Sequence, residues 1–256
     1  MSPISNDFVR PERLAAMEPF YPLHAYVCEH CWLVQLGEFQ PAEKIFTDEY
    51  AYFSSYSASW LDHAREYSLK MIDRFDFDQR TYVVELASND GYLLKNFKEQ
   101  GIQVLGVEPS ANVAQAAEEI GIPSLVKFFG VATAEEMTSD GIRADLLIGN
   151  NVLAHVPDLN DFVQGMKRLL SPHGVITMEF PHLMQLSRRS LTQFEQIRTV
   201  APDMIPLLLN SDLTDDSSGS NRPAQRLLLG RFRSLSQWGA RVFLVYASLR
   251  KLRGAQ

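Results

Sequence analysis

Two acidic residues flank a turn of small residues in the first half of the chain. An apolar run that ends at Glu85 is followed by the small residues at 87–91, among them Asp90, and then by leucines at helical spacing. This pattern predicts a strand, a tight turn and a helix, which together begin a βαβ unit. The first N–H groups of a helix have no partners within it, so a turn of small residues lets a ligand approach the backbone.

The composition of this turn indicates which ligand it can hold. A dinucleotide site needs a G-x-G-x-x-G run, whereas this turn offers only Gly91, so NAD is disfavoured. Glu85 and Asp90 suit a ligand that carries an ammonium group and no phosphate, and S-adenosylmethionine has both properties. Glu108 follows a second apolar run, where its carboxylate can accept hydrogen bonds from both hydroxyls of a ribose. The alternative is that these three acids are ordinary turn and cap residues.

Strand and helix patterns alternate from residue 81 to residue 179, with short connections. They predict a Rossmann-like α/β fold with a doubly wound, mostly parallel sheet. The expected strands are 82–87, 103–107, 124–127, 144–149 and 175–179. Ser110 and Asp158 are the expected N-caps of helices 111–120 and 159–170, and Thr133 with Glu136 forms a capping-box pattern.

The turns after these strands must meet at one edge of the sheet, where such folds bind ligands. Phe128 or Phe129 can stack on adenine there, and Asn150 with Asn151 can lie beside a sulfonium centre. The residues expected at the cofactor are Glu85, Ala87, Ser88, Asn89, Asp90, Gly91, Glu108, Pro109, Phe129, Asn150 and Asn151.

Two histidines follow the last two of these strands, where a substrate would approach a transferable methyl group. They are His155, after the fourth strand, and His182, after the fifth. A lone histidine is more often structural than catalytic, but the position of His182 behind Glu179 favours a role in the site.

Both cysteines lie in the first segment, as Cys28 and Cys31 of a C-x-x-C pair. Such a pair is half of a zinc-ribbon site, which normally takes four ligands, and His24 or His30 would have to replace the second pair. The alternative is two reduced thiols. A thioredoxin-like role is less favoured, because that motif belongs at a strand-to-helix turn.

An aromatic segment connects the two parts of the chain. Trp60, Ala64, Tyr67 and Met71 recur every three to four residues and predict an amphipathic helix that packs on the main domain. The tyrosines and phenylalanine that precede this helix are expected to pack in the core as a group. The alternative is that the hydroxyls of these tyrosines and of the serines between them contact a substrate or cofactor.

Several long runs resemble the S-adenosylmethionine-dependent sugar C-methyltransferases, which methylate carbon 3 of nucleotide-linked 4-keto-deoxysugars. The runs are residues 85–94, 106–109, 149–158 and 179–183. Residues 21–36 resemble the second knuckle of that family's zinc domain, and residues 52–57 its aromatic linker. The resemblance covers residues 1 to about 186, and runs of this length are more specific than a short motif.

The resemblance implies a mechanism and a set of catalytic residues. A base removes the proton at carbon 3, next to the C4 ketone, and the enolate carbon then attacks the methyl group of S-adenosylmethionine. Tyr56 and His182 are implied near the substrate and Glu108 at the ribose, and His155 completes the catalytic candidates. Polar groups must stabilise the enolate oxygen as its charge develops.

The chain departs from the family pattern at both ends, which predicts a truncated member. The family's first C-x-x-C knuckle would precede Met1, and its Tyr-His-Glu-His-Phe-Ser-Tyr run, which supplies the base, does not follow residue 183. From residue 187 onward, ten Arg and one Lys stand against five acids, a charge of +6. We expect a divergent basic tail at 187–256, disordered around 212–223, with a strand at 240–247 that can complete the sheet.

The organisation expected from these features has four parts. They are a partial zinc-binding-like segment at 1–45, an aromatic linker and helix at 46–80, the S-adenosylmethionine-binding domain at 81–186 and the tail at 187–256. The net charge of −7 disfavours nucleic acid as a partner. No run of about 18 apolar residues and no signal segment is present, so we expect a cytoplasmic protein without a membrane partner.

Three functions stay open at this point, and the oligomeric state is not indicated. The first is methyl transfer to a nucleotide-linked deoxysugar, weakened or lost because the base run is absent. The second is a catalytically inactive module that binds S-adenosylmethionine or a partner. The third is an active methyltransferase with another small-molecule acceptor. Loss of a general base typically slows a reaction by a factor of about 10² to 10⁴.

Overall fold

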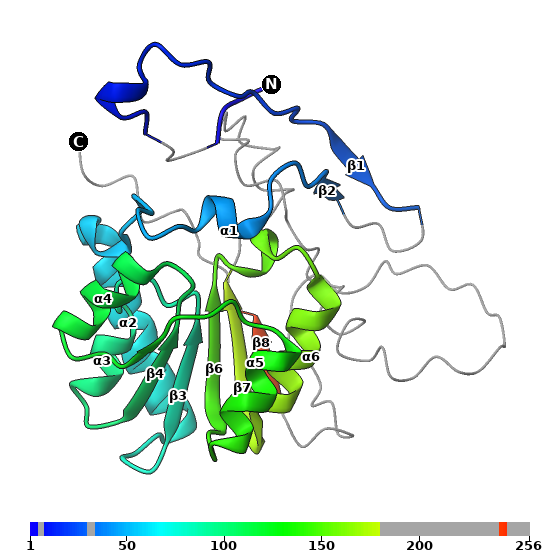
Figure 1. Ribbon diagram of the computed structural model, residues 1–256. Coiled ribbons are helices and arrows are strands. Elements are labelled where there is room, and N and C mark those ends of the chain that lie inside the picture. The colour runs from blue at the N-terminus through cyan, green and yellow to red at the C-terminus, as the bar shows by residue number, and fades with distance from the viewer. Residues whose placement is uncertain (5–7, 30–33, 180–240, 245–256) are drawn as a thin grey trace, which may run out of the picture.

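A computed structural model of the chain describes residues 1–4, 8–29, 34–179 and 241–244 (Figure 1). The N-terminal segment contains a short antiparallel pair, β1 (Ala25–Val27) and β2 (Val34–Leu36), preceded by the 3₁₀ turn η1 (Pro11–Arg13). The helix α1 (Ala42–Ile45) and the turn η2 (Ser54–Tyr56) lead into the main domain. Among the described helices, none is long and apolar enough to cross a membrane.

Six parallel strands form the central sheet, in the order β5-β4-β3-β6-β7-β8. They are β3 (Tyr82–Leu86), β4 (Gln103–Val107), β5 (Ser124–Leu125), β6 (Ala144–Asn150), β7 (Leu170–Glu179) and β8 (Arg241–Leu244). The chain steps outward from β3 to β5 and then returns to start β6 on the other side of β3. The predicted doubly wound parallel sheet is confirmed, and the sixth strand falls within the expected segment 240–247.

Four strand boundaries differ from the prediction, and the smallest difference is that β6 ends one residue later than expected, at Asn150. Strand β3 ends one residue early because Ala87 adopts a left-handed conformation, with φ of 55°. Strand β5 is shorter than expected, since the backbone N–H of Lys127 donates to the carbonyl of Leu125 and turns the chain away. Strand β7 begins at Leu170, directly after the preceding helix, because the backbone there is already extended, with ψ of 137°.

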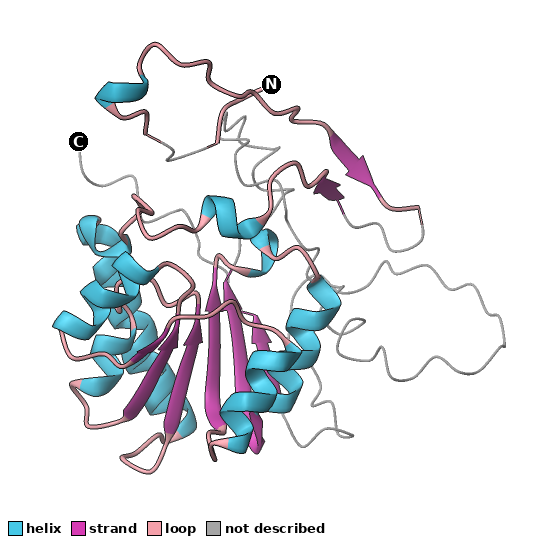
Figure 2. Ribbon diagram, viewed as in Figure 1, coloured by secondary structure: helices cyan, strands magenta, loops and turns pink. Residues whose placement is uncertain are grey.

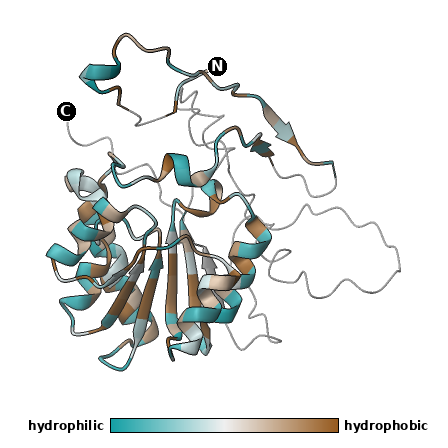
Figure 3. Ribbon diagram, in the orientation of Figure 1, coloured by the Kyte–Doolittle hydropathy of each residue, from teal (hydrophilic) through white to brown (hydrophobic). Residues whose placement is uncertain are grey.

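Helices cover both faces of the sheet (Figures 1 and 2). One face carries α2 (Ala58–Phe75), α3 (Leu94–Lys98) and α4 (Ala111–Glu119), and the other carries α5 (Val131–Ser139) and α6 (Leu159–Leu169), with η3 (Leu153–His155) between β6 and α6. Side chains of a strand alternate between the two faces, so each face has its own apolar cluster. Figure 3 shows the hydrophobic residues concentrated along the strands.

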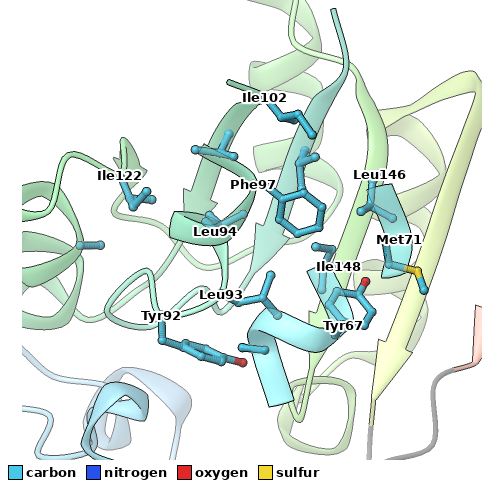
Figure 4. Packing of buried hydrophobic residues seen from close by; sticks show 14 of the residues in the cluster. Tyr67, Met71, Tyr92, Leu93, Leu94, Phe97, Ile102, Ile122, Leu146 and Ile148 are labelled. Atoms are coloured by element: carbon cyan, nitrogen blue, oxygen red, sulfur yellow. The ribbon is translucent and has the colours of Figure 1, made fainter. Parts of the chain in front are cut away.

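The predicted amphipathic helix is confirmed as α2. Ala64, Tyr67 and Met71 are buried against the sheet, and Figure 4 shows Tyr67 and Met71 beside Leu146 and Ile148 of β6. The helix begins where the Ser57 hydroxyl accepts a hydrogen bond from the N–H of Trp60, and it ends at a left-handed Asp76. The connector helix is therefore an integral layer of the main domain.

The predicted helix caps had mixed outcomes. Asp158 does cap α6, since its carboxylate accepts from the N–H of Asp161 at 2.9 Å. Ser110 precedes α4, but its side chain makes no cap bond. The capping box at Thr133 is wrong: α5 already begins at Val131, whose N–H donates to the Asp161 carboxylate of α6, while the Thr133 hydroxyl donates to the carbonyl of Phe128.

Helix α6 approaches the start of α5 at a position where only a glycine fits. A Cβ added to Gly165 would lie 2.7 Å from the backbone carbonyl of Gly130 and 3.1 Å from the ring of Phe129. Both atoms belong to the turn that follows β5. The close approach of α6 therefore fixes the position of a turn at the carboxyl edge of the sheet.

We expect Gly165→Ala to lower the free energy of unfolding by about 1–2 kcal/mol, because overpacking against the Gly130 backbone outweighs the better helix propensity of alanine. Urea unfolding measures the change. Gln164→Ala, at an exposed site of the same helix, is the control and should change stability by no more than about 0.5 kcal/mol. A Gly165→Ala protein as stable as the control would show that α6 moves away freely.

Candidate functional site

A cavity of about 650 Å³ opens at the carboxyl ends of β3, β4 and β6, the edge of the sheet where the arrow tips lie in Figure 2. The strand order reverses between β3 and β6, and open α/β sheets bind ligands at such a switch point. Its walls come from four turns, from α1, from the segment before α2 and from the first turn of α2. They include Ala87, Asn89, Glu108, Pro109, Phe128, Phe129, Asn150, Asn151, His155, Ala42, Phe46, Tyr50, Tyr52, Ser54 and Trp60.

The predicted cofactor residues divide into two groups around this cavity. Those that line it are Ala87, Asn89, Glu108, Pro109, Phe129, Asn150 and Asn151. Four others belong to β3 or its turn and are not part of the cavity wall, namely Glu85, Ser88, Asp90 and Gly91. Phe129 packs edge-on against Phe162 at 5.3 Å between ring centroids, which leaves the neighbouring Phe128, 40% exposed, as the more accessible ring.

The predicted catalytic residues do not all come together. His155 lines the cavity, on η3 after β6. Tyr56 is 81% exposed, and its ring stacks on that of Phe53 with 5.4 Å between the ring centroids. It lines a separate hollow, on the other side of the segment that connects α1 to α2. His182 lies outside the described residues.

The turn after β3 is held in an unusual backbone conformation. Ala87 and Asn89 both have positive φ, of 55° and 51°, and Gly91 has a φ of 74°. Left-handed non-glycine residues cost about 1–3 kcal/mol each and persist only where their surroundings enforce them. Here Ser88 packs so closely on β4 that a Cβ on Gly106 would lie 2.3 Å from the Ser88 hydroxyl oxygen.

Glu108 joins this turn to the start of α4. Its carboxylate accepts from the N–H of Asn89 at 3.0 Å and from the N–H of Ser110 at 2.9 Å, and the residue is 3% exposed. Burial raises the pKa of Glu108, while these hydrogen bonds act in the opposite direction. Each carboxylate oxygen has further acceptor capacity, so Glu108 can still accept hydrogen bonds from a ligand in the cavity it lines.

Buried carboxyl oxygens without partners make the site suitable for a cation. Both oxygens of Glu85 and the Oδ1 of Asp90 have no hydrogen-bond partner among the described residues. Burial raises the pKa of Glu85 well above its usual value, and the neighbouring charges of Asp90 and Glu108 raise it further. A positively charged ligand above this turn would relieve the mutual repulsion of the three acids, so the arrangement fits the ammonium and sulfonium groups of S-adenosylmethionine.

A layer of polar side chains between α2 and the sheet supports the cavity floor. Tyr92, which lines the cavity, is hydrogen-bonded to Asn150 and Trp60, and burial raises its pKa. Deeper in the layer, Tyr67 is hydrogen-bonded to Thr177 at 2.5 Å. His63 pairs with Glu179 at 2.7 Å, at the end of β7.

The aromatic segment forms part of the wall, whereas the sequence favoured core packing for it over contacts with a ligand. Tyr50, Tyr52 and Ser54 line the cavity, and Trp60 joins them from α2. Burial beside Glu108 and Tyr52 raises the pKa of Tyr50 to about 12. The every-second-residue spacing of the first three was the available signal, since it places them on one side of an extended segment.

The cysteine pair is only half described. Cys28 lies in the loop after β1, whereas Cys31 lies outside the described residues. Within the described ranges, no group of three or more His, Cys, Asp and Glu side chains is placed to hold a metal ion. Zinc binding by Cys28 and Cys31 therefore stays a prediction.

Comparison with known protein families gives two matches. Residues 59–213 match a family described as "Methyltransferase domain", and residues 1–46 match one described as "Putative zinc binding domain". The first match spans strands β3 to β7, helices α3 to α6, nearly all of α2 and the turns after the strands that wall the cavity.

Similar proteins are found among curated sequences. C-methyltransferase NovU of Streptomyces niveus is 30% identical over 196 residues, which are 77% of this chain and 46% of that protein. A ubiquinone biosynthesis O-methyltransferase of Rhodopseudomonas palustris (strain BisA53) is 26% identical over 54% of this chain and 63% of its own length. The chain thus spans about half the length of the first of these relatives.

Solved structures of low sequence identity also match. The plantazolicin methyltransferase BpumL in complex with SAH is 12% identical, with a TM-score of 0.47 over 60% of this chain and 62% of that chain. The PH0226 protein from Pyrococcus horikoshii OT3 is 17% identical, with a TM-score of 0.49 over 62% of this chain and 84% of that chain.

The raised pKa of Glu85 predicts a pH dependence of stability. The folded protein binds the proton on the Glu85 carboxyl group more tightly than the unfolded chain does. The contribution of this group to the free energy of unfolding is therefore fully present below the ordinary glutamate pKa, and it is lost as the pH rises through the raised pKa. In the absence of ligand, we expect the Tm of the wild type to fall relative to that of Glu85→Gln as the pH rises above about 4, the ordinary pKa of a glutamate.

Differential scanning calorimetry of both proteins across this range measures the difference. Glu99→Gln removes an exposed acid after α3 and serves as the control, whose Tm should follow that of the wild type. A difference in Tm between the wild type and Glu85→Gln that is the same at all pH values would contradict the assignment of Glu85 as a buried carboxyl group that retains its proton.

Proposed function

This chain belongs to the methyltransferase-domain family, and from that premise we propose that it is an S-adenosylmethionine-dependent C-methyltransferase that acts on carbon 3 of a nucleotide-linked 4-keto-deoxysugar. The observation that carries the proposal is the cavity at the switch point of the sheet, walled by Glu108 and by Ala87 and Asn89 of the turn after β3, next to the buried acids Glu85 and Asp90. Similarity to a protein named as a C-methyltransferase supports carbon as the acceptor atom.

The residues that would hold S-adenosylmethionine follow from their chemistry. Glu108 accepts hydrogen bonds from the ribose hydroxyls, and the exposed ring of Phe128 offers a surface for adenine. The negative charge of the turn after β3 stabilises the cationic end. When bound, S-adenosylmethionine supplies an electrophilic methyl group.

The β6 end of the cavity would receive the sugar. His155 is the histidine of the described part of the chain that lines the cavity, and we assign it the removal of the proton from carbon 3. Asn150, held by its hydrogen bond to Tyr92, offers an amide donor to the enolate oxygen. His182, three residues after the end of β7, is the second candidate base.

A second candidate function is a catalytically inactive module that keeps the cofactor cavity. It is favoured by the sequence after residue 183, which lacks the Tyr-His-Glu-His run of the sugar C-methyltransferases. Cofactor binding is common to both candidates, whereas proton removal from the sugar belongs to the first alone.

Calorimetric titration with S-adenosylhomocysteine tests the cofactor assignment. We expect the wild type to bind, and Glu108→Gln to bind at least about 10-fold more weakly, because an amide replaces a buried charged acceptor. Glu118→Gln removes one exposed acid from α4 and serves as the control for net charge. If Glu108→Gln and the control bind S-adenosylhomocysteine with equal affinity, Glu108 does not contact the ligand.

Exchange of the proton at carbon 3 tests the catalytic assignment without requiring methyl transfer. The protein, saturated with S-adenosylhomocysteine in deuterated water, should incorporate deuterium at carbon 3 of a nucleotide-linked 4-keto-deoxysugar. His155→Ala should slow the exchange by a factor of about 10² or more, whereas His173→Ala, at an exposed site of β7, should not. Cofactor binding without any exchange would favour the inactive module.

A further inference from the structure

The segment that precedes α2 separates the cofactor cavity from a second hollow. We call residues 50–56 the strap. Its residues Tyr50, Tyr52 and Ser54 line the cavity, together with Glu108. Three others, Phe53, Ser55 and Tyr56, line a hollow of about 640 Å³ next to α3. In Figure 1 the chain between α1 and α2 runs across the carboxyl edge of the sheet, so the strap lies over the cavity rather than beside the core.

Asn89 fastens the middle of the strap to the turn after β3. Its amide oxygen accepts from the N–H of Ser54 at 2.7 Å, and its amide nitrogen donates to the carbonyl of Tyr52 at 3.1 Å. Its own backbone N–H donates to Glu108 at 3.0 Å. Asn89 therefore connects Glu108, the acid that we assign to the ribose, with the backbone of the strap at Tyr52 and at Ser54.

Two further side chains hold the strap on either side of this point. The carboxylate of Asp90 accepts from the N–H of Ser55 at 3.0 Å. The amide of Asn112, on α4, donates to the carbonyl of Tyr50 at 2.9 Å. All four hydrogen bonds reach the backbone of the strap, so they fix its path and leave the side chains of Tyr50 and Tyr52 to face the cavity.

We propose that the strap is a wall of the S-adenosylmethionine site and that Asn89 is the positioning residue that couples this wall to Glu108. The inference rests on the proposed function; it adds the strap, which lies between the two family matches, and gives Asn89, expected at the cofactor from the sequence, the further role of fastening it. A ligand held by Glu108 stabilises the turn to which the strap is fastened, and the fastened strap forms one wall of the cavity. Ligand release then requires these hydrogen bonds to open.

Asn89→Gly is the variant that isolates the coupling. Glycine adopts the φ of 51° without strain, so the turn and its backbone bond to Glu108 are retained while both side-chain bonds to the strap are lost. We expect S-adenosylhomocysteine to bind about 10- to 100-fold more weakly, with most of the change in the dissociation rate. Asp76→Gly is the matched control, since Asp76 has a φ of 54° at the exposed end of α2, and its affinity should equal that of the wild type.

Hydrogen exchange supplies a readout that a general loss of stability would not reproduce. The amides of Ser54 and Ser55 are the donors to Asn89 and Asp90, so S-adenosylhomocysteine should slow their exchange in the wild type. In Asn89→Gly the strap amides should exchange faster, while the amides of β4 should not change.

Asn112→Ala provides an independent variant in case Asn89→Gly does not fold. Asn112 belongs to α4 and is not part of the cavity wall, whereas its amide donates to the strap at Tyr50. We therefore expect its substitution to affect the binding of S-adenosylhomocysteine through the strap. We expect a loss of affinity of about 3- to 10-fold, for one hydrogen bond.

The outcomes separate the two proposals. If the wild type binds S-adenosylhomocysteine but Asn89→Gly and Asn112→Ala bind it equally tightly, the role of the strap is overturned and the proposed function stands. If the folded wild type does not bind it at all, the proposed function itself is overturned.

Discussion

The carboxylate of Glu108 joins the ends of two neighbouring parallel strands, and the rest of the site depends on it. It holds the N–H of Asn89, in the turn after β3, and the N–H of Ser110, at the start of α4. The turn can come this close to β4 only because residue 106 is a glycine. The left-handed backbone of the turn after β3 then directs the side chain of Asn89 toward the strap. Glu108 thus fixes both the turn that borders the cavity and, through Asn89, the strap that forms its outer wall.

The same turn is costly for the protein without ligand. Left-handed residues and buried carboxyl oxygens without partners each lower stability, and Glu85, Asp90 and Glu108 repel one another. Folding tolerates this arrangement because two apolar layers on either side of the sheet hold the strands in place. A cationic ligand offsets part of the cost, so the features that destabilise the turn are those that make it a binding site.

Sequence patterns predicted the parts of this structure that depend on local periodicity. The five expected strands, the amphipathic helix with Tyr67, and the meeting of Glu108 and Asn150 at one edge all follow from apolar spacing and parallel topology. The missed features depend on contacts between distant residues. Ser54 bonds to Asn89, 35 positions away, and the start of α5 is capped by Asp161 of α6. No local spacing encodes such bonds.

The central claim is that the cavity over Glu108 binds S-adenosylmethionine, and a crystal structure of the chain with S-adenosylhomocysteine tests it most directly. The account predicts the ligand at the carboxyl ends of β3 and β4, with its ribose hydroxyls within hydrogen-bonding distance of Glu108 and the strap closed over it. A ligand bound elsewhere, or a cavity that stays empty at a saturating concentration of ligand, would contradict the account.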